Sequence, residues 1–269
     1  MTDQVPMNAE PRIPIWPTTL TGEAPEDVPT LEWFPASGSA EGCVLVCPGG
    51  GYAFVSDTES YTIAHWLNRA GWHAAVLRYR VGPRHRFPAQ LYDAERAMRM
   101  IRAEAGSRGF DPQRVAAVGF SAGGHLVSML AVQPEPEPSP DDDLAPQFDS
   151  RPAAVVLCYP VIDLAGDHRH EGSRFNLLGP DAPADLSERL STHQRVDSQT
   201  PPSFLWHTAD DGGVAMAHSM QFAAACRAAD VPVELHIYES GRHGLALAED
   251  APDVAGWPDL AARFLARHL

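Results

Sequence analysis

A serine, an aspartate and a histidine that together could cleave an acyl bond occur in that order along the chain. Ser121 lies in Gly119-Phe120-Ser121-Ala122-Gly123, directly after the apolar run 114–118. A strand that ends in G-x-S-x-G and then opens a helix makes a sharp turn, which exposes the serine at the top of a sheet. We expect Ser121 to be a nucleophile. Both glycines should be required, because any Cβ there would collide with a neighbouring strand or helix.

A serine hydroxyl is nearly inert at neutral pH, so a nucleophilic Ser121 needs a neighbouring base. His243 is the candidate base, since it lies between glycines in the loop 241–244 that follows the last expected strand. His125 is one helical turn beyond Ser121 and points down that helix. His207 ends a strand, where we expect it to brace a loop.

An acid must hold the imidazole of His243 in the right tautomer and stabilise its protonated form. Asp210 and Asp211 both follow the strand that ends at His207. In the hydrolases that the order Ser, Asp, His resembles, the acid commonly lies three residues before a valine that starts the next helix. With Val214 in that position, the spacing selects Asp211. Asp210 would then cap or brace the turn, and it is the alternative choice of acid.

The negative charge that develops on an attacked carbonyl oxygen needs backbone N–H donors. One comes from the residue after the nucleophile, Ala122. The others are expected from Gly50 and Gly51, in the turn Pro48-Gly49-Gly50-Gly51-Tyr52. Glycine lets the backbone approach a substrate closely. The alternative interpretation of these glycines is a flexible connector.

Strands that alternate with helices must position these residues, and the alternation predicts a parallel sheet covered by helices on both faces. We expect one α/β domain over residues 1–269, since 44% apolar residues can cover both faces of such a sheet. The expected strands are 43–47, 72–77, 114–118, 155–159, 204–207 and 233–238. The expected helices are 58–70, one opened by Pro88, one after Ser121, 215–229 and 260–268.

Three segments lie outside the alternation. Residues 1–30 are proline-rich and acidic, and we interpret them as an extended arm anchored by Trp16. The segment 133–152 is also proline-rich and acidic, and we expect it to be solvated. The segment 163–200 follows a strand, so it leaves from the carboxyl end of the sheet, where ligands bind. A long insertion in that position is usually functional, and it predicts a small cap over the site.

Composition restricts the partners. A net charge of −15 argues against nucleic acid and anionic membranes as partners. No apolar stretch approaches the length of a membrane span, and residues 1–6 show no secretion signal, so we expect a cytoplasmic protein.

The four cysteines are expected to be buried thiols, because Cys43 and Cys47 lie too far apart on one strand for a disulfide. His168 and His170 lack further ligands at fitting spacing, so no metal site is expected.

The chain resembles bacterial acetyl xylan esterase-like hydrolases, in the esterase and hormone-sensitive-lipase-like branch of the α/β-hydrolases. The order Ser, Asp, His is the order that α/β-hydrolases use. Two departures leave the catalytic atoms intact: Pro48 replaces a frequent histidine, and Ala215 replaces a frequent proline. The matching stretches, within about residues 42–245, are 48–52, 77–81, 119–126, 159–162, 176–179, 200–208 and 241–244.

The resemblance implies an α/β-hydrolase fold and hydrolysis of short acyl esters, often acetyl groups on sugars, without a cofactor. We also expect Tyr52, Phe120, Pro160 and Leu177 to bind the substrate. An amidase or formamidase-type hydrolase is the alternative enzyme, because the same triad cleaves amides. A silent binding module of the same fold is the alternative of another class, and the intact His243 argues against it. The partner is expected to be a small ester, and the formation of homo-oligomers stays open.

Overall fold

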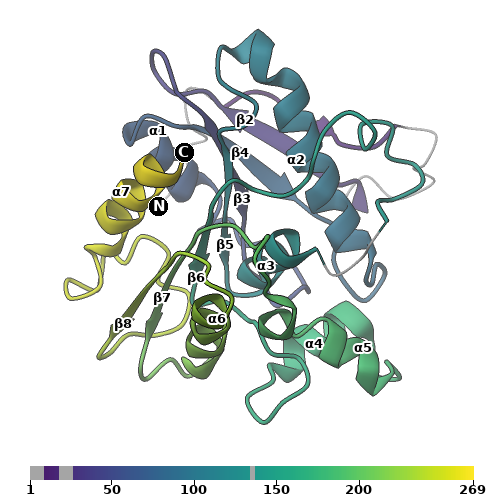
Figure 1. Cartoon of the computed structure of the whole chain (residues 1–269), viewed down its shortest axis with the longest axis vertical. Coiled ribbons are helices and arrows are strands. Elements are labelled where there is room, and N and C mark those ends of the chain that lie inside the picture. The colour runs from purple at the N-terminus through teal and green to yellow at the C-terminus, as the bar shows by residue number, and fades with distance from the viewer. Residues whose placement is uncertain (1–8, 18–26, 134–136) are drawn as a thin grey trace.

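The computed structural model describes residues 9–17, 27–133 and 137–269, and its centre is an eight-stranded sheet in the order β1-β2-β4-β3-β5-β6-β7-β8 (Figure 1). From β4 to β8 neighbouring strands run parallel, whereas β2 runs antiparallel to both β1 and β4. The strands are β1 (Ile13–Pro14), β2 (Thr30–Phe34), β3 (Cys43–Cys47), β4 (His73–Arg78), β5 (Val115–Phe120), β6 (Val155–Cys158), β7 (Ser203–Thr208) and β8 (Val233–Tyr238).

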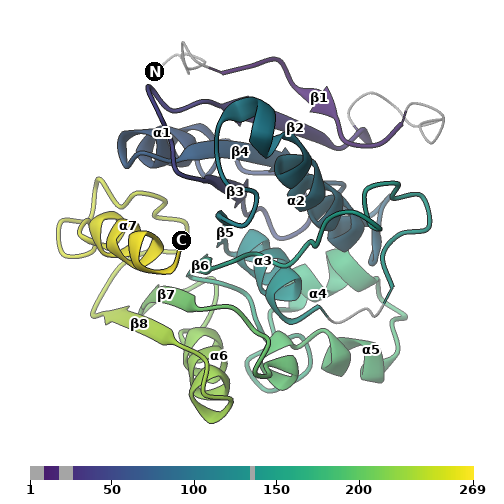
Figure 2. The same cartoon turned by 45° about the horizontal axis from the view of Figure 1, so that its top comes forward.

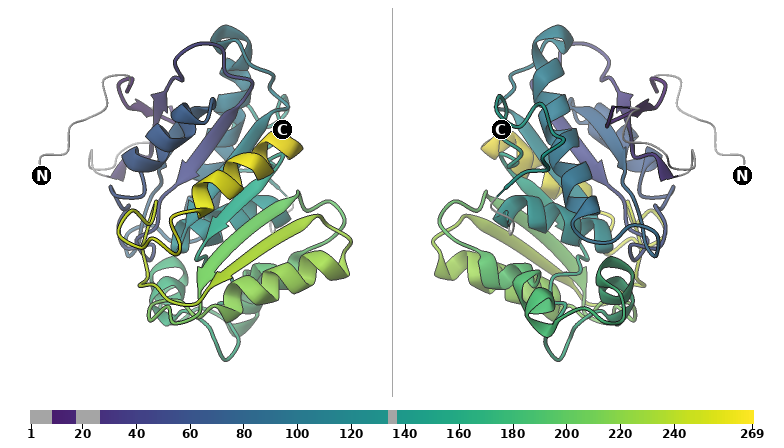
Figure 3. Two further views of the ribbon diagram at one scale, coloured as in Figure 1. Left: turned by 90° about the vertical axis from the view of Figure 1, so that its left-hand side faces the viewer. Right: turned by 90° about the vertical axis from the view of Figure 1, so that its right-hand side faces the viewer.

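Helices cover both faces of this sheet, as the alternation predicts. Side chains of α2, α3 and α6 pack on one face and side chains of α1 and α7 on the other. In the ribbons of Figure 3, α7 lies in front of the sheet in the left view and α2 in front of it in the right view. Every residue of β3 is buried because both of its faces are covered, and this explains its unbroken apolar run. The helices are α1 (Tyr61–Arg69), α2 (Ala89–Arg108), α3 (Ala122–Val132), α4 (Glu171–Leu178), α5 (Ala184–Arg189), α6 (Ala217–Ala228) and α7 (Trp257–His268), with a 3₁₀ turn, η3, at Thr192–Arg195.

The strand order reverses between β3 and β5, since β4 lies beyond β3 and β6 lies beyond β5. In an open α/β sheet, ligands bind outside the carboxyl ends of the strands at such a reversal. The glycine turn follows β3 and Ser121 follows β5, and these two strands pair directly with Cys47 opposite Gly119. The topology therefore brings the expected nucleophile and the expected oxyanion turn to one point.

The two antiparallel strands at the N-terminal side are absent from the sequence prediction. Strand β2 pairs with β4 along its whole length, with Thr30 opposite Arg78 and Phe34 opposite Ala74. Of the expected arm 1–30, residues 1–8 and 18–26 lie outside the described residues. Trp16 is nearly buried, and its indole N–H donates to Asp93 Oδ1 over 2.6 Å.

The segment 133–152 differs from its expected solvated state, although residues 134–136 lie outside the described residues. Asp142 is buried against α2, where its two carboxylate oxygens each lie 2.6 Å from a guanidinium nitrogen, one of Arg96 and one of Arg99. An acidic stretch can be buried when guanidinium groups on a neighbouring helix pair with its carboxylates. The prediction was therefore wrong for Asp142.

The segment 163–200 forms α4, α5 and η3, which lie on the side of α2 and α3, away from α1 and α7 (Figures 1 and 2). Leu164, Leu177 and Leu190 have no exposed surface, because they belong to the same apolar cluster as α2, α3 and α6. Most apolar side chains of this segment therefore join the main core, and Phe175 is its large exposed one.

Candidate active site

Ser121 occupies the turn between β5 and α3 in a conformation that the sequence motif predicts. Its backbone has φ 52° and ψ −118°, a strained combination for a residue with a side chain. A Cβ on Gly119 would lie 2.3 Å from the carbonyl oxygen of Gly123, and a Cβ on Gly123 would lie 2.1 Å from that of Cys47. The expected need for glycine on both sides of the serine is therefore confirmed.

The structure brings Ser121, His243 and Asp211 into one hydrogen-bonded series. Ser121 Oγ lies 2.8 Å from His243 Nε2, and His243 Nδ1 lies 2.8 Å from Asp211 Oδ2. These side chains come from the carboxyl ends of β5, β8 and β7 respectively. With Nδ1–H donating to the carboxylate, Nε2 is free to accept the serine proton, which is the arrangement that a general base requires.

Asp211 is held as a carboxylate by several donors. Its Oδ1 accepts the backbone N–H groups of Gly213 and Val214 over 2.7 and 3.0 Å. Burial alone would raise the pKa of Asp211. Hydrogen bonds from His207, His243 and Val214 outweigh that effect and hold the pKa well below its usual value. Asp211 therefore stays negatively charged beside His243 at any pH near neutrality.

Asp210 and His207 brace the loops around the acid, as expected. The Asp210 carboxylate accepts the Ser240 hydroxyl over 2.6 Å and the Gly241 N–H over 2.7 Å, so it ties the acid loop to the start of the histidine loop. His207 Nδ1 lies 2.8 Å from Ser219 Oγ, and its Nε2 lies 2.9 Å from the Val214 carbonyl oxygen. Asp211 is thus the aspartate that is hydrogen-bonded to His243, and Asp210 is the one that braces the turn.

The glycine turn after β3 presents its backbone toward Ser121. Gly50, Gly51 and Tyr52 have φ values of 128°, 61° and 60°, so three successive residues adopt left-handed conformations. Within the described part of the chain, no hydrogen-bond acceptor lies at the N–H groups of Gly50 and Gly51. The N–H of Ala122 is at the first residue of α3, where helical N–H groups have no partner within the helix. These three donors are available for an oxyanion.

The four expected substrate-contacting side chains require a correction, because all four are buried. Tyr52 and Leu177 have no exposed surface, and the Tyr52 hydroxyl lies 2.8 Å from His125 Nδ1. Phe120 is fully buried on the α1 and α7 face, where its ring lies 6.2 Å from that of Trp257. Pro160 is buried against α3 beside Gly124. These four side chains are buried in the core beneath the loops that carry the site, so they present no surface to a substrate.

The sequence does not predict the contacts of Glu59 and Tyr159 with the loops around Ser121 and His243. Glu59 and Tyr159 are buried, and their hydrogen bonds reach the glycine turn and the histidine loop. A glutamate just before a helix gives no sequence signal for such a role. Tyr159 was recognised only as part of a buried strand and a matching stretch.

The segment 163–200, for which we predict a cap, approaches the hydrogen-bonded series at two places. Asn176 Nδ2 donates to the carbonyl oxygen of Gly51 over 2.8 Å, so α4 lies against the glycine turn. A cavity of about 500 Å³ separates cap residues 167–172 from the acid loop 211–215, and the cap histidines His168 and His170 line it. Burial lowers the pKa of His170, and the nearby His243 acts in the same direction.

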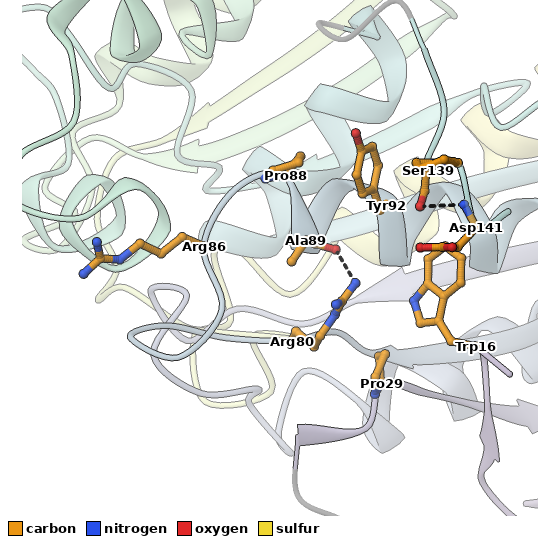
Figure 4. A pocket seen from close by; sticks show the side chains of 10 residues that line it. Trp16, Pro29, Arg80, Arg86, Pro88, Ala89, Tyr92, Ser139 and Asp141 are labelled. Carbon is orange, nitrogen blue, oxygen red and sulfur yellow. Dashed lines mark hydrogen bonds between the residues drawn. The ribbon is translucent and has the colours of Figure 1, made fainter. Parts of the chain in front are cut away.

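A second hollow lies away from this site, beside α2. It has a volume of about 390 Å³, and Trp16, Arg80, Arg86 and Tyr92 are among the residues that line it (Figure 4). None of the three hydrogen-bonded residues Ser121, His243 and Asp211 lines it.

Among the described residues, no group of three or more histidine, cysteine, aspartate or glutamate side chains is placed to hold a metal ion. No helix in the described ranges is long and apolar enough to span a membrane.

Comparisons with known proteins agree with this fold. The BD-FAE family model matches residues 33–226. The crystal structure of an acetyl ester-xyloside bifunctional hydrolase from Caldicellulosiruptor lactoaceticus superimposes with a TM-score of 0.89. It has 40% sequence identity, and the match covers 99% of this chain and 98% of that one. The fold is thus the α/β-hydrolase fold that the sequence predicts.

Two curated relatives are similar over most of this chain. An acetylxylan esterase of Xylanibacter ruminicola is 34% identical over 75% of the chain, and endo-1,4-beta-xylanase B of Butyrivibrio fibrisolvens is 34% identical over 80% of it. The matches cover 40% and 34% of the length of those two proteins. The similarity therefore concerns one part of each longer relative.

Proposed function

The chain belongs to the BD-FAE family of α/β-hydrolases, and on that premise we propose that it is a serine carboxylesterase for short acyl esters, with acetyl esters preferred. The observation that supports the proposal best is the series Ser121 Oγ–His243 Nε2 and His243 Nδ1–Asp211 Oδ2, with 2.8 Å at each step. Nucleophile, base and orienting acid are all in hydrogen-bond reach before any substrate is bound.

In the proposed reaction, Ser121 Oγ attacks the carbonyl carbon of the ester while its proton passes to His243 Nε2. The resulting oxyanion accepts hydrogen bonds from the N–H groups of Gly50, Gly51 and Ala122. His243 then returns the proton to the leaving oxygen, so the alcohol departs and the acyl group stays on Ser121. Water, deprotonated by His243, attacks this acyl-enzyme, and the carboxylic acid leaves as Ser121 regains its proton.

Asp211 supports both steps without itself taking a proton. Its lowered pKa keeps it ionised, so it stabilises the imidazolium that forms each time His243 accepts a proton. The strained φ of Ser121 keeps the hydroxyl in front of His243 and clear of β5. The site therefore supplies all the acid–base chemistry of ester hydrolysis from this chain's own residues.

Acetylated sugars are the substrate class that we propose. The acetylxylan esterase of Xylanibacter ruminicola and the acetyl ester-xyloside hydrolase of Caldicellulosiruptor lactoaceticus support it by their names. The cavity beside the acid loop also supports it, because histidine and charged side chains of the cap line that cavity and would suit an alcohol rich in hydroxyl groups.

A panel of substrates tests the proposal. Acetylated xylo-oligosaccharides, p-nitrophenyl acetate, ethyl acetate and p-nitroacetanilide would be compared by kcat/KM, with Ser121→Ala as the blank. We expect release of acetate from the esters and a much lower rate with the anilide. A rate with the anilide that exceeds the rates with the esters would favour the amidase instead.

A further inference from the structure

Glu59 is a buried carboxylate outside the hydrogen-bonded series of Ser121, His243 and Asp211. It lies just before α1 and is only 5% exposed. Its Oε2 accepts the N–H of Gly49 over 2.7 Å, and its Oε1 accepts the hydroxyl of Tyr159 over 2.7 Å. In the part of the chain that the structure describes, no arginine, lysine or histidine forms an ion pair with it. Burying a carboxylate without a paired cation is costly, so its place beside the active site calls for a reason.

One end of this arrangement holds the oxyanion turn. Gly49 precedes the two expected oxyanion donors Gly50 and Gly51. A Cβ built on Gly49 would lie 2.6 Å from Glu59 Oε2 and 3.1 Å from Ser121 Cβ. The Gly49 peptide is therefore packed between the carboxylate and the nucleophile. Its hydrogen bond to Glu59 fixes how far the turn stands from Ser121.

The other end holds the histidine loop. Tyr159 follows β6 with φ 36°, and its ring lies edge-on to the imidazole of His243 with 5.0 Å between ring centroids. Its hydroxyl donates to Glu59 and accepts the N–H of Ala246, three residues after His243, over 3.0 Å. A single path of three hydrogen bonds thus runs from Gly49 through Glu59 and Tyr159 to Ala246.

We propose that Glu59 and Tyr159 are positioning residues that fix the oxyanion turn and the His243 loop relative to each other, an inference that rests on the proposed esterase function. The oxyanion donors and the base must act on one substrate carbonyl at the same time. A displacement of about 1 Å between such groups can reduce the rate by about 10²-fold. The three hydrogen bonds hold this separation in the free enzyme, before a substrate can do so.

The Gly49 N–H and the Tyr159 hydroxyl can both donate to Glu59, and this pattern suits an ionised carboxylate. Burial raises the pKa of Glu59, while the hydrogen bonds from Tyr159 and Gly49 and the nearby His243 oppose that rise. In Glu59→Gln, the amide oxygen could still accept from Gly49. Its NH₂ group would then face the Tyr159 hydroxyl, whose proton would lose its acceptor. Glu59→Gln therefore breaks the bond between Glu59 and Tyr159, and Tyr159→Phe removes that bond together with the one to Ala246.

The test compares two acetate esters that differ in their need for a proton on the leaving group. Nitrophenolate departs without one, whereas the ethoxide of ethyl acetate needs the proton from His243. Both rates are proportional to the amount of folded enzyme. The ratio of kcat/KM for the two esters therefore does not change when part of the protein fails to fold. Glu95→Gln is the matched control, since Glu95 is equally buried but lies on α2, beside Arg99.

We expect Glu59→Gln and Tyr159→Phe each to lower kcat/KM for p-nitrophenyl acetate by about 10- to 100-fold. The loss for ethyl acetate should be several-fold larger still, and Glu95→Gln should leave the ratio unchanged. The double variant should be no worse than the more damaged single variant, because both substitutions break one path.

Equal losses on both esters, or no loss in Tyr159→Phe, would overturn the positioning role. If Glu59→Gln does not fold, Tyr159→Phe decides the matter alone, because it removes one hydroxyl and keeps the ring. A wild-type enzyme that hydrolyses neither ester would contradict the proposed function itself, and the inference with it.

Discussion

Asp211 and Glu95 are both largely buried carboxylates, yet their surroundings move their pKa values in opposite directions. Glu95 lies on α2, where burial raises its pKa to about 7 and Arg99 stands 3.6 Å away. Asp211 lies in a loop after β7, where backbone N–H groups and two histidines outweigh burial and hold its pKa low. The two carboxylates differ in their donors, since the loop of Asp211 turns two backbone N–H groups onto it, whereas Glu95 has the guanidinium of Arg99 at 3.6 Å.

The two regions also differ in what their buried charges contact. On α2, Arg96 and Arg99 pair with Asp142 and hold the segment after α3 against the helix. At the strand ends, Asp211 contacts a histidine that is still 28% exposed in its side chain and bonded to a serine. The charges of the first region pair with one another inside the protein, whereas in the second region Asp211 pairs with a partly exposed imidazole, where we propose that the reaction takes place. Substitutions should therefore affect stability in the first region and turnover in the second.

The largest effect is expected at the nucleophile and the base. Ser121→Ala and His243→Ala should each lower kcat by about 10⁴- to 10⁶-fold, because each removes a group that the proposed reaction uses in both steps. Their thermal unfolding midpoints should stay near that of the wild type. Steady-state rates with p-nitrophenyl acetate, together with thermal melts, check this. A tenth of the wild-type rate in either variant would contradict the assignment.

The next effect separates the two neighbouring aspartates. Asp211→Asn should lower kcat by about 10⁴-fold, since an amide would leave His243 in the wrong tautomer. Asp210→Asn should lower it far less, because Asp210 accepts hydrogen bonds from Ser240 and Gly241 and forms none with His243 among the described residues. The two variants serve as controls for each other in the same assay. The opposite ranking would transfer the role of the acid to Asp210.

The α2 region should show the converse behaviour. Asp142→Asn leaves two buried guanidinium groups with less compensation, so the free energy of unfolding should fall by about 3 kcal/mol. The kcat of the folded variant should match that of the wild type. Urea unfolding gives the first quantity and initial rates give the second. A large loss of kcat without a loss of stability would show that the two regions are coupled.

The smallest effect concerns the acyl chain. A long chain needs apolar surface at about 0.8 kcal/mol per buried methylene, but Leu164, Leu177, Leu178 and Leu190 of the segment 163–200 are already buried in the core. We expect kcat/KM to be highest for acetyl or propionyl esters and to fall by at least about tenfold, or about 1.4 kcal/mol, by octanoyl. A series of nitrophenyl esters measures this. A rate that rises with chain length would point to a lipase-like apolar surface.

The sequence predicts most of the fold and the arrangement of Ser121, Asp211 and His243, because those signals are local. Turns such as the one at Ser121 need glycine at fixed offsets, and buried parallel strands are unbroken apolar runs. Strand β2 was not predicted, since its place in the sheet depends on pairing with β4, which is distant in the sequence. The burial of Asp142 likewise depends on Arg96 and Arg99 across a gap of more than 40 residues.

The substrate-contacting side chains were the least predictable part of the site. Tyr52, Phe120 and Leu177 are next to functional residues in the sequence, yet all three side chains are buried. Phe120 is the last residue of β5, and its side chain points to the face of the sheet that α1 and α7 cover, so it is buried in the core although it precedes Ser121. The hydrogen bonds of Glu59 and Tyr159 join residues 100 positions apart, and no motif signals them.

The claim that Ser121 is an activated nucleophile is tested most directly by a fluorophosphonate probe read out by peptide mass spectrometry. We expect one probe per chain, attached to the peptide that holds Ser121, with loss of esterase activity in proportion to labelling. His243→Ala, which keeps the serine but lacks its base, should label far more slowly. An active preparation that remains unlabelled at Ser121, or that keeps its activity after full labelling there, would show that Ser121 is not the nucleophile.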